Sequence, residues 1–340
     1  MGSGYRVQPI LEVNNVTTAF YTDRGLVKAV ENISFTVNPG ETVCIVGESG
    51  SGKSVMSLSA LRLIDYENGQ VLNGEILFNG EDLLKKNREE MRRVRGSQIA
   101  MIFQEPMTAL NPVFTIGKQI SEAIRLHNDC SKEQAMIRAK ELLTLVGISE
   151  SEMRLKQYPH ELSGGMRQRV MIAMALSCDP KLLIADEPTT ALDVTIQAQI
   201  LNLLKELNEK RNMAIVLITH DIGVAAQMAD KIVVMYAGRV MEEGTVYEIF
   251  DKPQHPYTIG LLSSIPTIDG NRSIRLQSIQ GNIPSLTEMP QGCRFSPRCM
   301  FATEKCFTEE PLLQSINSRK IACWNHDKVN SDFSLTHRKK

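Results

Sequence analysis

Residues 47–54 read Gly47-Glu48-Ser49-Gly50-Ser51-Gly52-Lys53-Ser54, which matches the phosphate-binding pattern G-x-x-x-x-G-K-[ST] at every position. The apolar run Thr42–Val46 precedes it, and a helix is expected to start near Gly52. The order strand, glycine loop, helix separates a phosphate loop from a glycine-rich turn with an exposed lysine. We therefore expect these residues to surround nucleotide phosphates, with Lys53 on the β- and γ-phosphates and Ser54 on Mg²⁺.

A second apolar run, Leu182–Ala185, ends in two carboxylates, Asp186 and Glu187. Carboxylates at the end of a buried strand are costly unless they have a task. Asp186 is placed to bind Mg²⁺, directly or through water, and Glu187 to act as the general base for an attacking water. The alternative is a pair of acidic residues that only caps the strand end.

Ser163-Gly164-Gly165 opens a segment rich in Met, Ala and Ile that is typical of a helix. A serine N-cap followed by glycines leaves N–H groups and the positive end of the helix dipole facing outward, which suits an anion. Because the chain already has a phosphate loop, a second phosphate site is useful only if it serves a neighbouring subunit. An ordinary capped helix is the alternative.

Most of the chain alternates β-type and helical stretches, which predicts an α/β fold with a parallel sheet. Helical periodicity fills residues from about 105 to 165, and past about residue 265 prolines separate short, aperiodic pieces. The expected strands are Leu11–Val16, Ala29–Val37, Thr42–Val46, Gly74–Phe78, Gln98–Phe103, Leu182–Ala185, Ala214–Ile218 and Lys231–Tyr236.

Composition excludes some classes of function. The 340 residues carry a formal net charge of −1, which gives no reason to expect a nucleic-acid partner. No apolar run approaches the length that spans a bilayer, and no signal peptide is recognisable, so any membrane role is expected through other subunits on the cytoplasmic side. A chain of this length accommodates one large α/β domain and a smaller appendage.

Five motifs follow one another: the phosphate loop, Gln104, Leu162–Arg169, Leu182–Pro188 and Thr219–Asp221. Together they resemble the ATP-binding subunit of an ABC transporter, over roughly the first 260 residues. The resemblance implies an ABC-type P-loop ATPase domain at 5–264, with a RecA-like parallel sheet, an antiparallel β subdomain and a helical subdomain at about 105–165. It also implies an aromatic residue that stacks on adenine, here Phe20, with Tyr21 as the alternative.

The same resemblance implies roles for the polar residues of the motifs. Gln104 reaches Mg²⁺ and the attacking water, and His220 contacts the γ-phosphate and positions that water. The signature Ser163-Gly164-Gly165 closes over ATP held by the opposite subunit, and Asp193 couples the two sites. The expected reaction is ATP hydrolysis with Mg²⁺.

Four of the seven cysteines are clustered, with the spacing Cys293-x5-Cys299-x6-Cys306-x16-Cys323. Spacing alone leaves a metal site and free thiols both open, because no tight C-x2–4-C pair occurs. The segment 292–324 has few periodic apolar residues, so it is not expected to fold on packing alone, and metal–thiolate bonds are expected to organise it.

Several motifs near the cysteines look like the C-terminal extension of ATP-binding subunits from oligopeptide/dipeptide transporters. They are His255-Pro256-Tyr257-Thr258, Leu261–Pro266, Gly292–Phe295 and Pro297–Cys299. The resemblance implies that residues 265–340 form this extension and that its four cysteines hold a [4Fe-4S] cluster, with Zn²⁺ as the alternative.

The family therefore implies the ATP-hydrolysing subunit of a bacterial importer of di- and oligopeptides, peripheral on the cytoplasmic face of the cell membrane. Its implied partners are a second, homologous but non-identical ATP-binding subunit, two transmembrane permeases and, indirectly, an extracytoplasmic peptide-binding protein. A nickel or other small-solute importer is one alternative, and a soluble ABC-type ATPase of DNA repair or translation is another. Peptide length and the identity of the ATPase partner stay open.

Overall fold

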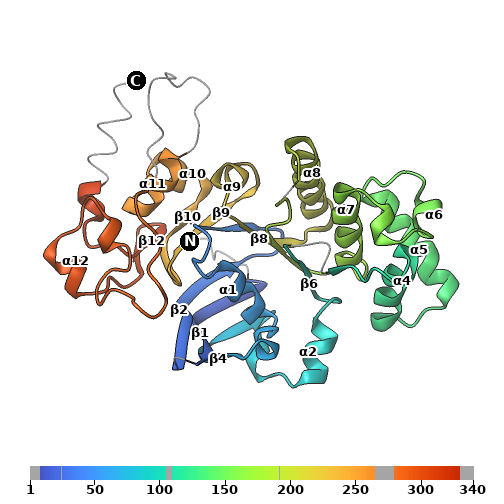
Figure 1. Ribbon diagram of the computed structural model, residues 1–340, viewed down its shortest axis with the longest axis horizontal. Helices are drawn as coiled ribbons and strands as arrows, with labels where there is room; N and C mark the ends of the chain where they lie inside the picture. The colour runs from blue at the N-terminus through green and yellow to red at the C-terminus, as the bar shows by residue number, and fades with distance from the viewer. Residues whose placement is uncertain (1–7, 24, 105–108, 191, 265–278, 330–340) are drawn as a thin grey trace, which may run out of the picture. The chain divides into compact units, whose positions relative to one another are not determined.

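The computed structural model describes residues 8–23, 25–104, 109–190, 192–264 and 279–329 of the chain (Figure 1). The described residues of Met1–Ile10, Val37–Glu41 and Asp82–Ile218 form a first unit. Those of Leu11–Thr36, Thr42–Glu81 and Thr219–Lys340 form a second unit. Both units combine strands with helices, which agrees with the predicted α/β class.

The first unit contains three parallel strands in the order β8-β7-β6. Leu182 of β7 lies beside Ile99 of β6 and Ala214 of β8. Every residue of β7 is buried, as expected for a parallel strand that is covered on both faces and apolar along its length. The strands are β6 (Ile99–Ile102), β7 (Leu182–Asp186) and β8 (Ala214–Thr219).

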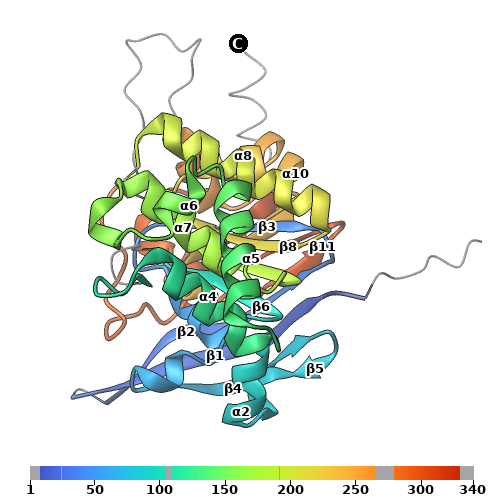
Figure 2. The same ribbon diagram turned by 90° about the vertical axis from the view of Figure 1, so that its right-hand side faces the viewer.

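Helices make up most of the remaining first unit, and α4, α5, α6 and α7 pack together as a group (Figure 1 and Figure 2). Capping sets where they start: the Thr115 hydroxyl accepts the Lys118 N–H before α4, and Ser131 and Gln134 form a reciprocal capping box at α5. These helices confirm the predicted periodicity. The bounds are η2 Leu83–Lys85, α2 Arg88–Val94, α4 Ile116–His127, α5 Lys132–Leu145, α6 Ser151–Arg154, η3 Pro159–Glu161, α7 Gly164–Ala175 and α8 Val194–Arg211.

The second unit begins with an antiparallel sheet in the order β2-β1-β4-β5. Leu11 of β1 pairs with Phe78 of β4, and Val13 pairs with Ile76, so that their buried side chains share one face. This sheet is the predicted antiparallel β subdomain. Its strands are β1 (Leu11–Thr22), β2 (Gly25–Val37), β4 (Gly69–Phe78) and β5 (Glu81–Asp82).

The second unit also contains strands in the order β11-β12-β10-β9-β3. Val43 of β3 lies parallel beside Lys231 of β9, and β10 returns antiparallel after a tight turn at Ala237 and Gly238. The bounds are β3 Thr42–Val46, α1 Lys53–Ala60, η1 Ile64–Tyr66, α9 Ile222–Met228, β9 Lys231–Tyr236, β10 Arg239–Thr245, α10 Val246–Asp251 and α11 Pro256–Ser263.

The C-terminal extension adds two strands to this second sheet. Its described part, 279–329, holds η4 (Ser296–Arg298), α12 (Glu304–Thr308) and a hairpin of β11 (Gln314–Ile316) and β12 (Arg319–Ile321). β12 pairs antiparallel with β10, with Ile321 opposite Glu242. These strands are not predictable from the sequence, because three residues are too few to show a period of two.

An aromatic cluster joins the extension to the ATPase region of the second unit. The Phe295 ring lies 5.2 Å from the Tyr236 ring and 5.3 Å from the Tyr257 ring, measured between centroids. The Tyr236 and Tyr257 rings are themselves 4.7 Å apart, and His255 lies 5.9 Å from Phe295. All four side chains are buried, so Phe295 anchors the extension in a packed core that it shares with the ATPase region.

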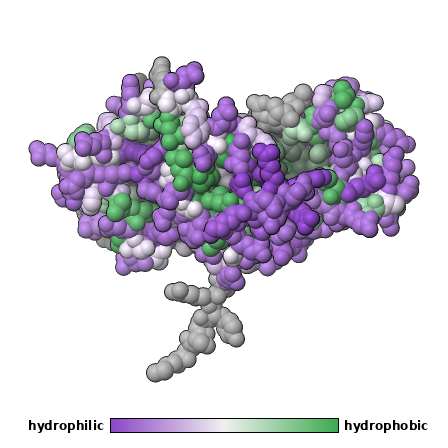
Figure 3. Space-filling model, turned by 90° about the horizontal axis from the view of Figure 1, so that it is seen from below, coloured by the Kyte–Doolittle hydropathy of each residue, from purple (hydrophilic) through white to green (hydrophobic). Residues whose placement is uncertain are grey.

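Hydrophilic residues cover most of the face shown in Figure 3, and hydrophobic residues form small, separate patches on it. Scattered apolar residues of this kind are normal on protein surfaces. Among the described residues, no helix combines the length and the apolar character needed to cross a membrane.

Removing the Phe295 ring should destabilise the extension. Phe295→Ala leaves a cavity among Tyr236, Tyr257 and His255, and should lower the free energy of unfolding by about 3–5 kcal/mol. Urea denaturation followed by the fluorescence of Trp324, the only tryptophan of the chain, measures this change where it occurs. The control is Phe307→Ala, since Phe307 is 53% exposed, and its effect should stay within about 1 kcal/mol. Equal effects of the two changes would contradict the aromatic core.

The buried imidazole of His255 should make stability depend on pH. Burial lowers the pKa of His255 from 6.5 to about 3, although a hydrogen bond with the Ala322 backbone opposes this shift. As the pH falls below about 6.5, His255 therefore binds a proton in the unfolded chain but stays neutral in the folded chain. The contribution of His255 is fully present above that pH and is lost as the pH falls toward 3, by up to about 1.4 kcal/mol per pH unit.

His255→Asn isolates this contribution, because asparagine keeps an acceptor for the Tyr257 N–H but does not titrate. Urea denaturation at about pH 7 and about pH 5 should show a steeper loss of stability for the wild type than for the variant. An equal loss of stability between the two pH values in the wild type and the variant would mean that His255 is not neutral in the folded chain.

Candidate nucleotide site

The phosphate loop connects the buried strand β3 to helix α1 in the second unit. Gly52 is the N-cap of α1 with φ +96°, and a Cβ there would lie 2.7 Å from Val30 Cγ1. A Cβ at Gly47 would lie 2.1 Å from the Met235 carbonyl oxygen of β9. Glycine is therefore required at both positions, by dihedral angle at one and by space at the other.

The ammonium group of Lys53 lies inside this loop. The residue is 5% exposed, and its Nζ donates to the carbonyl oxygens of Gly47 at 2.7 Å and Glu48 at 2.9 Å. A buried cation is costly unless an anion offsets its desolvation. The loop thus holds Lys53 where a bound phosphate group would supply that anion, while Ser54 is exposed at the start of α1.

In the first unit, the structure brings Gln104 and Glu187 together. The Glu187 Oε2 accepts from Gln104 Nε2 at 3.0 Å and from the Thr190 hydroxyl at 2.9 Å, and the Glu187 N–H donates to the Ile218 carbonyl at 2.9 Å. Glu187 has φ +45°, an uncommon conformation for a residue with a side chain. Such strain persists where the surrounding structure enforces it, often at a functional position. Asp186, 5% exposed, is the last residue of β7.

The signature segment forms the start of helix α7. Ser163 is the N-cap, and its hydroxyl accepts the Met166 N–H at 3.3 Å. Ser163 and Gly164 are exposed, and a Cβ at Gly164 would meet nothing within 4 Å, whereas one at Gly165 would lie 3.0 Å from Ile196. The N-terminal end of this 12-residue helix is thus open to a ligand from outside.

Gln168 is a residue that the sequence analysis did not assign. It is 2% exposed on α7, and its Nε2 donates to the Pro188 carbonyl at 2.5 Å. It therefore ties the signature helix to the segment that follows Glu187. Its place in the motif Leu162–Arg169, where it follows the glycines by three residues, was the available signal.

Asp193 and His220 both lie next to the start of a helix. The Asp193 carboxylate caps α8 by accepting the Ile196 N–H at 2.9 Å, which is a structural task in itself. His220 is exposed between β8 and Asp221, the N-cap of α9. Their roles toward ATP stay predictions.

Phe20 stays the predicted adenine-stacking ring, with Tyr21 as the alternative. Phe20 is half-buried near the end of β1 and pairs with Gly69, which has no side chain to cover it. Tyr21 is 61% exposed, and its hydroxyl donates to the Gln70 side chain at 3.0 Å. Phe20, Tyr21, the phosphate loop and His220 belong to the second unit, and the other candidate residues belong to the first.

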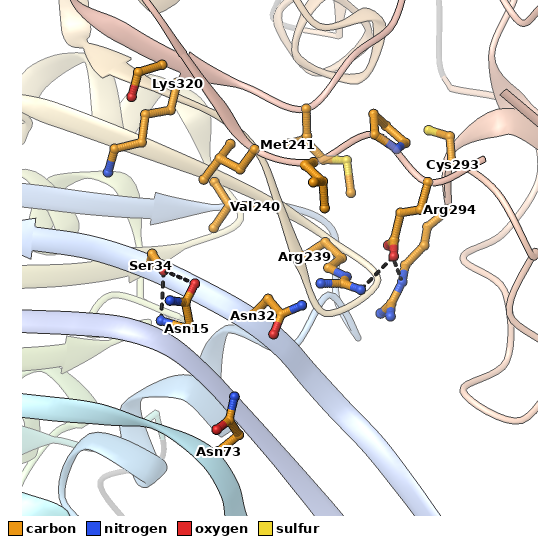
Figure 4. A pocket seen from close by; sticks show the side chains of 16 residues that line it. Asn15, Asn32, Ser34, Asn73, Arg239, Val240, Met241, Cys293, Arg294 and Lys320 are labelled. Carbon is orange, nitrogen blue, oxygen red and sulfur yellow. Dashed lines mark hydrogen bonds and ion pairs between the residues drawn. The ribbon is translucent and has the colours of Figure 1, made fainter. Parts of the chain in front are cut away.

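A cavity in the described part of the second unit is a different feature. Its volume is about 570 Å³, and the side chains of Asn15, Asn32 and Asn73 line it, with Arg239 and Arg294 (Figure 4). The two arginines are paired with Glu31 and Glu310. No residue of the phosphate loop lines this cavity.

The prediction of a metal centre at the cysteines is wrong. Cys293, Cys299, Cys306 and Cys323 line one small cavity, but no group of three or more His, Cys, Asp or Glu side chains in the described residues is arranged to hold a metal ion. Neither the [4Fe-4S] cluster nor its Zn²⁺ alternative is therefore supported.

The physical reasons are space, charge and packing. The cavity has a volume of about 10 Å³, close to what one water needs and far below the size of a cluster. Burial raises the pKa of Cys299 to about 11 and that of Cys323 to about 12, which favours neutral thiols. The Cys306 sulfur accepts from Asn325 Nδ2 at 3.5 Å. The aromatic cluster around Phe295, which the aperiodic sequence concealed, supplies the packing that the metal was expected to replace.

Comparison with known proteins identifies the family of the chain. A model of the ABC transporter family matches residues 30–190, and a model of the oligopeptide/dipeptide transporter C-terminal region matches residues 241–306. The oligopeptide transport ATP-binding protein AppD of Bacillus subtilis is 51% identical over 326 residues, which are 96% of this chain and 99% of that protein. A putative peptide import ATP-binding protein of Brucella melitensis is 52% identical over 320 residues, which are 91% and 95% of the two chains.

Solved structures give the same assignment. The post-hydrolysis dimer of the ATP-binding cassette MJ0796, bound to ADP and Pi, has 31% sequence identity and a TM-score of 0.62, and covers 69% of this chain and 98% of that one. Part of a cbiONQ transporter complex, cbiO1 from Clostridium perfringens, has 28% identity and a TM-score of 0.62, over 72% and 91% of the two chains. The chain therefore belongs to the ATP-binding subunits of ABC transporters, in the family that carries the oligopeptide/dipeptide-type C-terminal region.

Proposed function

We propose that this chain is the ATP-hydrolysing subunit of an ABC importer that powers uptake of di- and oligopeptides across the cytoplasmic membrane. The observation that carries the proposal is a phosphate loop with a buried Lys53, in a chain that also has the oligopeptide/dipeptide-type C-terminal region. The names of the similar proteins refer to peptides, which favours this class of substrate over nickel or another small solute.

The residues around the motifs suit the binding of MgATP. Lys53 offers a cation to the β- and γ-phosphates. Ser54, Asp186 and Gln104 carry the oxygen ligands that Mg²⁺ prefers and would hold it. Mg²⁺, when bound, neutralises charge that develops on the phosphates. Phe20 offers a ring face to adenine. The remaining residues of the phosphate loop supply N–H groups: Gly47, Glu48, Ser49, Gly50, Ser51 and Gly52.

Glu187 is the proposed general base, which accepts a proton from the water that attacks the γ-phosphate. Gln104 and Thr190 donate hydrogen bonds to its carboxylate and fix its position. Gln104 can orient the same water through its amide, and His220 is proposed to contact the γ-phosphate. Hydrolysis then breaks the bond to the γ-phosphoryl group and releases ADP and phosphate.

The open start of α7 supports a working pair of ATPase subunits. Ser163, Gly164 and Gly165 would bind the phosphates held by the partner, and Asp193 would couple the two sites. The proposed partners are a homologous, non-identical ATP-binding subunit, two transmembrane permeases and, through them, an extracytoplasmic peptide-binding protein. The chain would lie on the cytoplasmic face of the membrane, with residues 5–264 as the ATPase domain and 265–340 as the extension.

A transport assay tests the proposal directly. Cells whose only copy of this chain carries Glu187→Gln should lose uptake of labelled di- and oligopeptides while nickel uptake is unchanged. Loss of nickel uptake with peptide uptake intact would reassign the substrate. No loss of either would remove the chain from import.

Glu187→Gln should abolish steady-state hydrolysis by the assembled transporter and leave ATP binding intact. Glutamine keeps the shape of the side chain but cannot take a proton, and loss of a positioned base costs a factor of roughly 10²–10⁴ in rate. Phosphate release and nucleotide titration measure the two effects. Glu206→Gln, at an exposed ion pair with Lys210 on α8, is the control and should hydrolyse ATP like the wild type. Hydrolysis by Glu187→Gln within threefold of wild type would move the base to another residue.

Gly164→Asp should block the paired site without harming the fold. The new side chain meets nothing within 4 Å, and a carboxylate in the first turn of a helix is favourable. It would nevertheless stand where the partner's phosphates are expected. ATP binding by the isolated chain and its Tm should be unchanged, while ATPase activity of the assembled transporter should fall by at least about tenfold. Gly164→Ala adds bulk without charge and should retain most activity. If the isolated chain loses ATP affinity instead, the signature does not act on the partner.

A further inference from the structure

We propose that Arg298, in the C-terminal extension, is a positioning residue for the phosphate loop. It holds and neutralises the Glu48 carboxylate so that the loop can accept the phosphates of ATP. This inference rests on the proposed binding of ATP at residues 47–54, and it gives the extension a direct part in nucleotide binding.

The Arg298 guanidinium makes a two-pronged ion pair with Glu48. Its Nη1 lies 2.7 Å from Glu48 Oε2, and its Nη2 lies 3.0 Å from Glu48 Oε1. The paired arrangement matches the planar fork of arginine to both oxygens of a carboxylate. The two residues are 250 positions apart in the sequence, and both belong to the second unit.

Every N–H group of this guanidinium has a partner. Besides the two bonds to Glu48, Nη1 donates to the Tyr236 hydroxyl at 3.3 Å and Nη2 to the Ile279 carbonyl at 3.2 Å. Nε donates to the Gln280 carbonyl at 2.8 Å. An arginine has five such donors, so all are used and the side chain is fixed. Lysine could supply at most three donors and no fork.

Burial makes this pair matter more than a surface ion pair. The side chain of Arg298 is 6% exposed and that of Glu48 is 28% exposed. Exposed pairs contribute little, but removal of one partner from a desolvated pair leaves the other charge uncompensated. Without Arg298, an unpaired carboxylate would remain in the second position of the phosphate loop.

The position of Glu48 determines what that charge would do. Lys53 Nζ donates to the carbonyl oxygens of Gly47 and Glu48. These carbonyls belong to Glu48 itself and to the residue before it. An uncompensated carboxylate there would compete with phosphate for the lysine and would repel an anionic ligand. Arg298 occupies both oxygens of this carboxylate, so the carboxylate does not compete with phosphate for Lys53.

Tyr257 of α11 holds the backbone of the same residue. Its hydroxyl oxygen accepts the Glu48 N–H at 2.8 Å, and its fully buried ring packs on Tyr236 and Phe295. Burial raises the pKa of Tyr257, so the hydroxyl stays protonated and adds no negative charge to the loop. Side chain and backbone of Glu48 are thus both anchored by residues outside the loop.

The packing of the extension carries these contacts. Arg298 ends η4, and its guanidinium lies over the Tyr236 ring, 5.6 Å from the centroid, and over the Phe295 ring at 6.0 Å. Strand β12 of the extension and helix α11 both pack on β10 (Figure 1). Through Arg298, the aromatic cluster is therefore in contact with the nucleotide loop.

The test is a double-mutant cycle on the full-length chain, with Mg²⁺ and ATP as the probe and calorimetric titration as the measurement. Arg298→Gln should weaken ATP binding by about tenfold, the size expected for loss of hydrogen bonds to a charged group. Glu48→Gln combined with Arg298→Gln removes both charges and should restore affinity to within about threefold of wild type. A role in folding alone would give no such rescue.

Arg319→Gln is the matched control. Arg319 is another arginine of the extension, 8% exposed, that pairs with a carboxylate of the ATPase region, Glu242 on β10. No described hydrogen bond joins its side chain to the loop. The change should lower the Tm and leave ATP affinity as in wild type. If Arg319→Gln weakens ATP binding as much as Arg298→Gln, the effect is general destabilisation and the proposal is overturned.

The other possible results also decide whether Arg298 positions the loop. ATP affinity of Arg298→Gln equal to wild type, or a double variant as weak as Arg298→Gln, overturns the proposal. A wild-type chain that binds no ATP contradicts the proposed function instead. If Arg298→Gln does not fold, Arg298→Lys replaces it in the cycle and should weaken ATP binding by about threefold, again recovered by Glu48→Gln. Unchanged affinity of Arg298→Lys would then overturn the proposal.

Discussion

A buried ammonium group is the constraint around which the second unit is organised. Lys53 is almost fully removed from water, and the loop compensates it with the carbonyl oxygens of Gly47 and Glu48. This arrangement requires a sharp turn between β3 and α1, which in turn requires glycine where φ is positive and where β9 approaches closely. Carbonyl oxygens carry only partial negative charge, so we expect a phosphate anion to bind favourably beside this cation. The expected phosphate binding would then follow from how the strand and the helix are joined.

In the first unit, charged side chains also lie at the end of a buried strand, but here they are carboxylates. Asp186 and Glu187 end a strand that is buried along its whole length, and the chain turns sharply directly after it, with Glu187 at positive φ. Gln104 and Thr190 hold the Glu187 side chain in place. Gln168 links the signature helix to the next residue, Pro188. The proposed base Glu187, its partner Gln104 and the signature helix are therefore parts of one hydrogen-bonded region, although they come from three separate motifs.

The sequence predicts those elements that short-range patterns of apolar and glycine residues determine. The buried strands at 42–46, 182–186 and 231–236, the phosphate loop and the helices between 116 and 145 all follow from apolar periodicity and capping residues. The hairpin of β11 and β12 was missed because three-residue strands show no period, and the Phe295 core because its partners are distant in sequence. The prediction of a metal centre at the cysteines was wrong for a similar reason. Their spacing shows that the thiols are close in sequence, but it does not show the volume, burial or packing between them.

The two glutamates next to the nucleotide motifs show why long-range contacts decide function. The guanidinium of Arg298 binds both carboxylate oxygens of Glu48, so this side chain is held as part of the structure of the loop. The carboxylate of Glu187 accepts hydrogen bonds from the Gln104 amide and the Thr190 hydroxyl, which fix its position. Both residues are glutamates within motifs expected to bind nucleotide, and nothing local in the sequence separates them. Their long-range partners differ: Arg298, 250 positions from Glu48, ties that carboxylate to the extension, while Gln104, 83 positions from Glu187, holds the carboxylate of the proposed base.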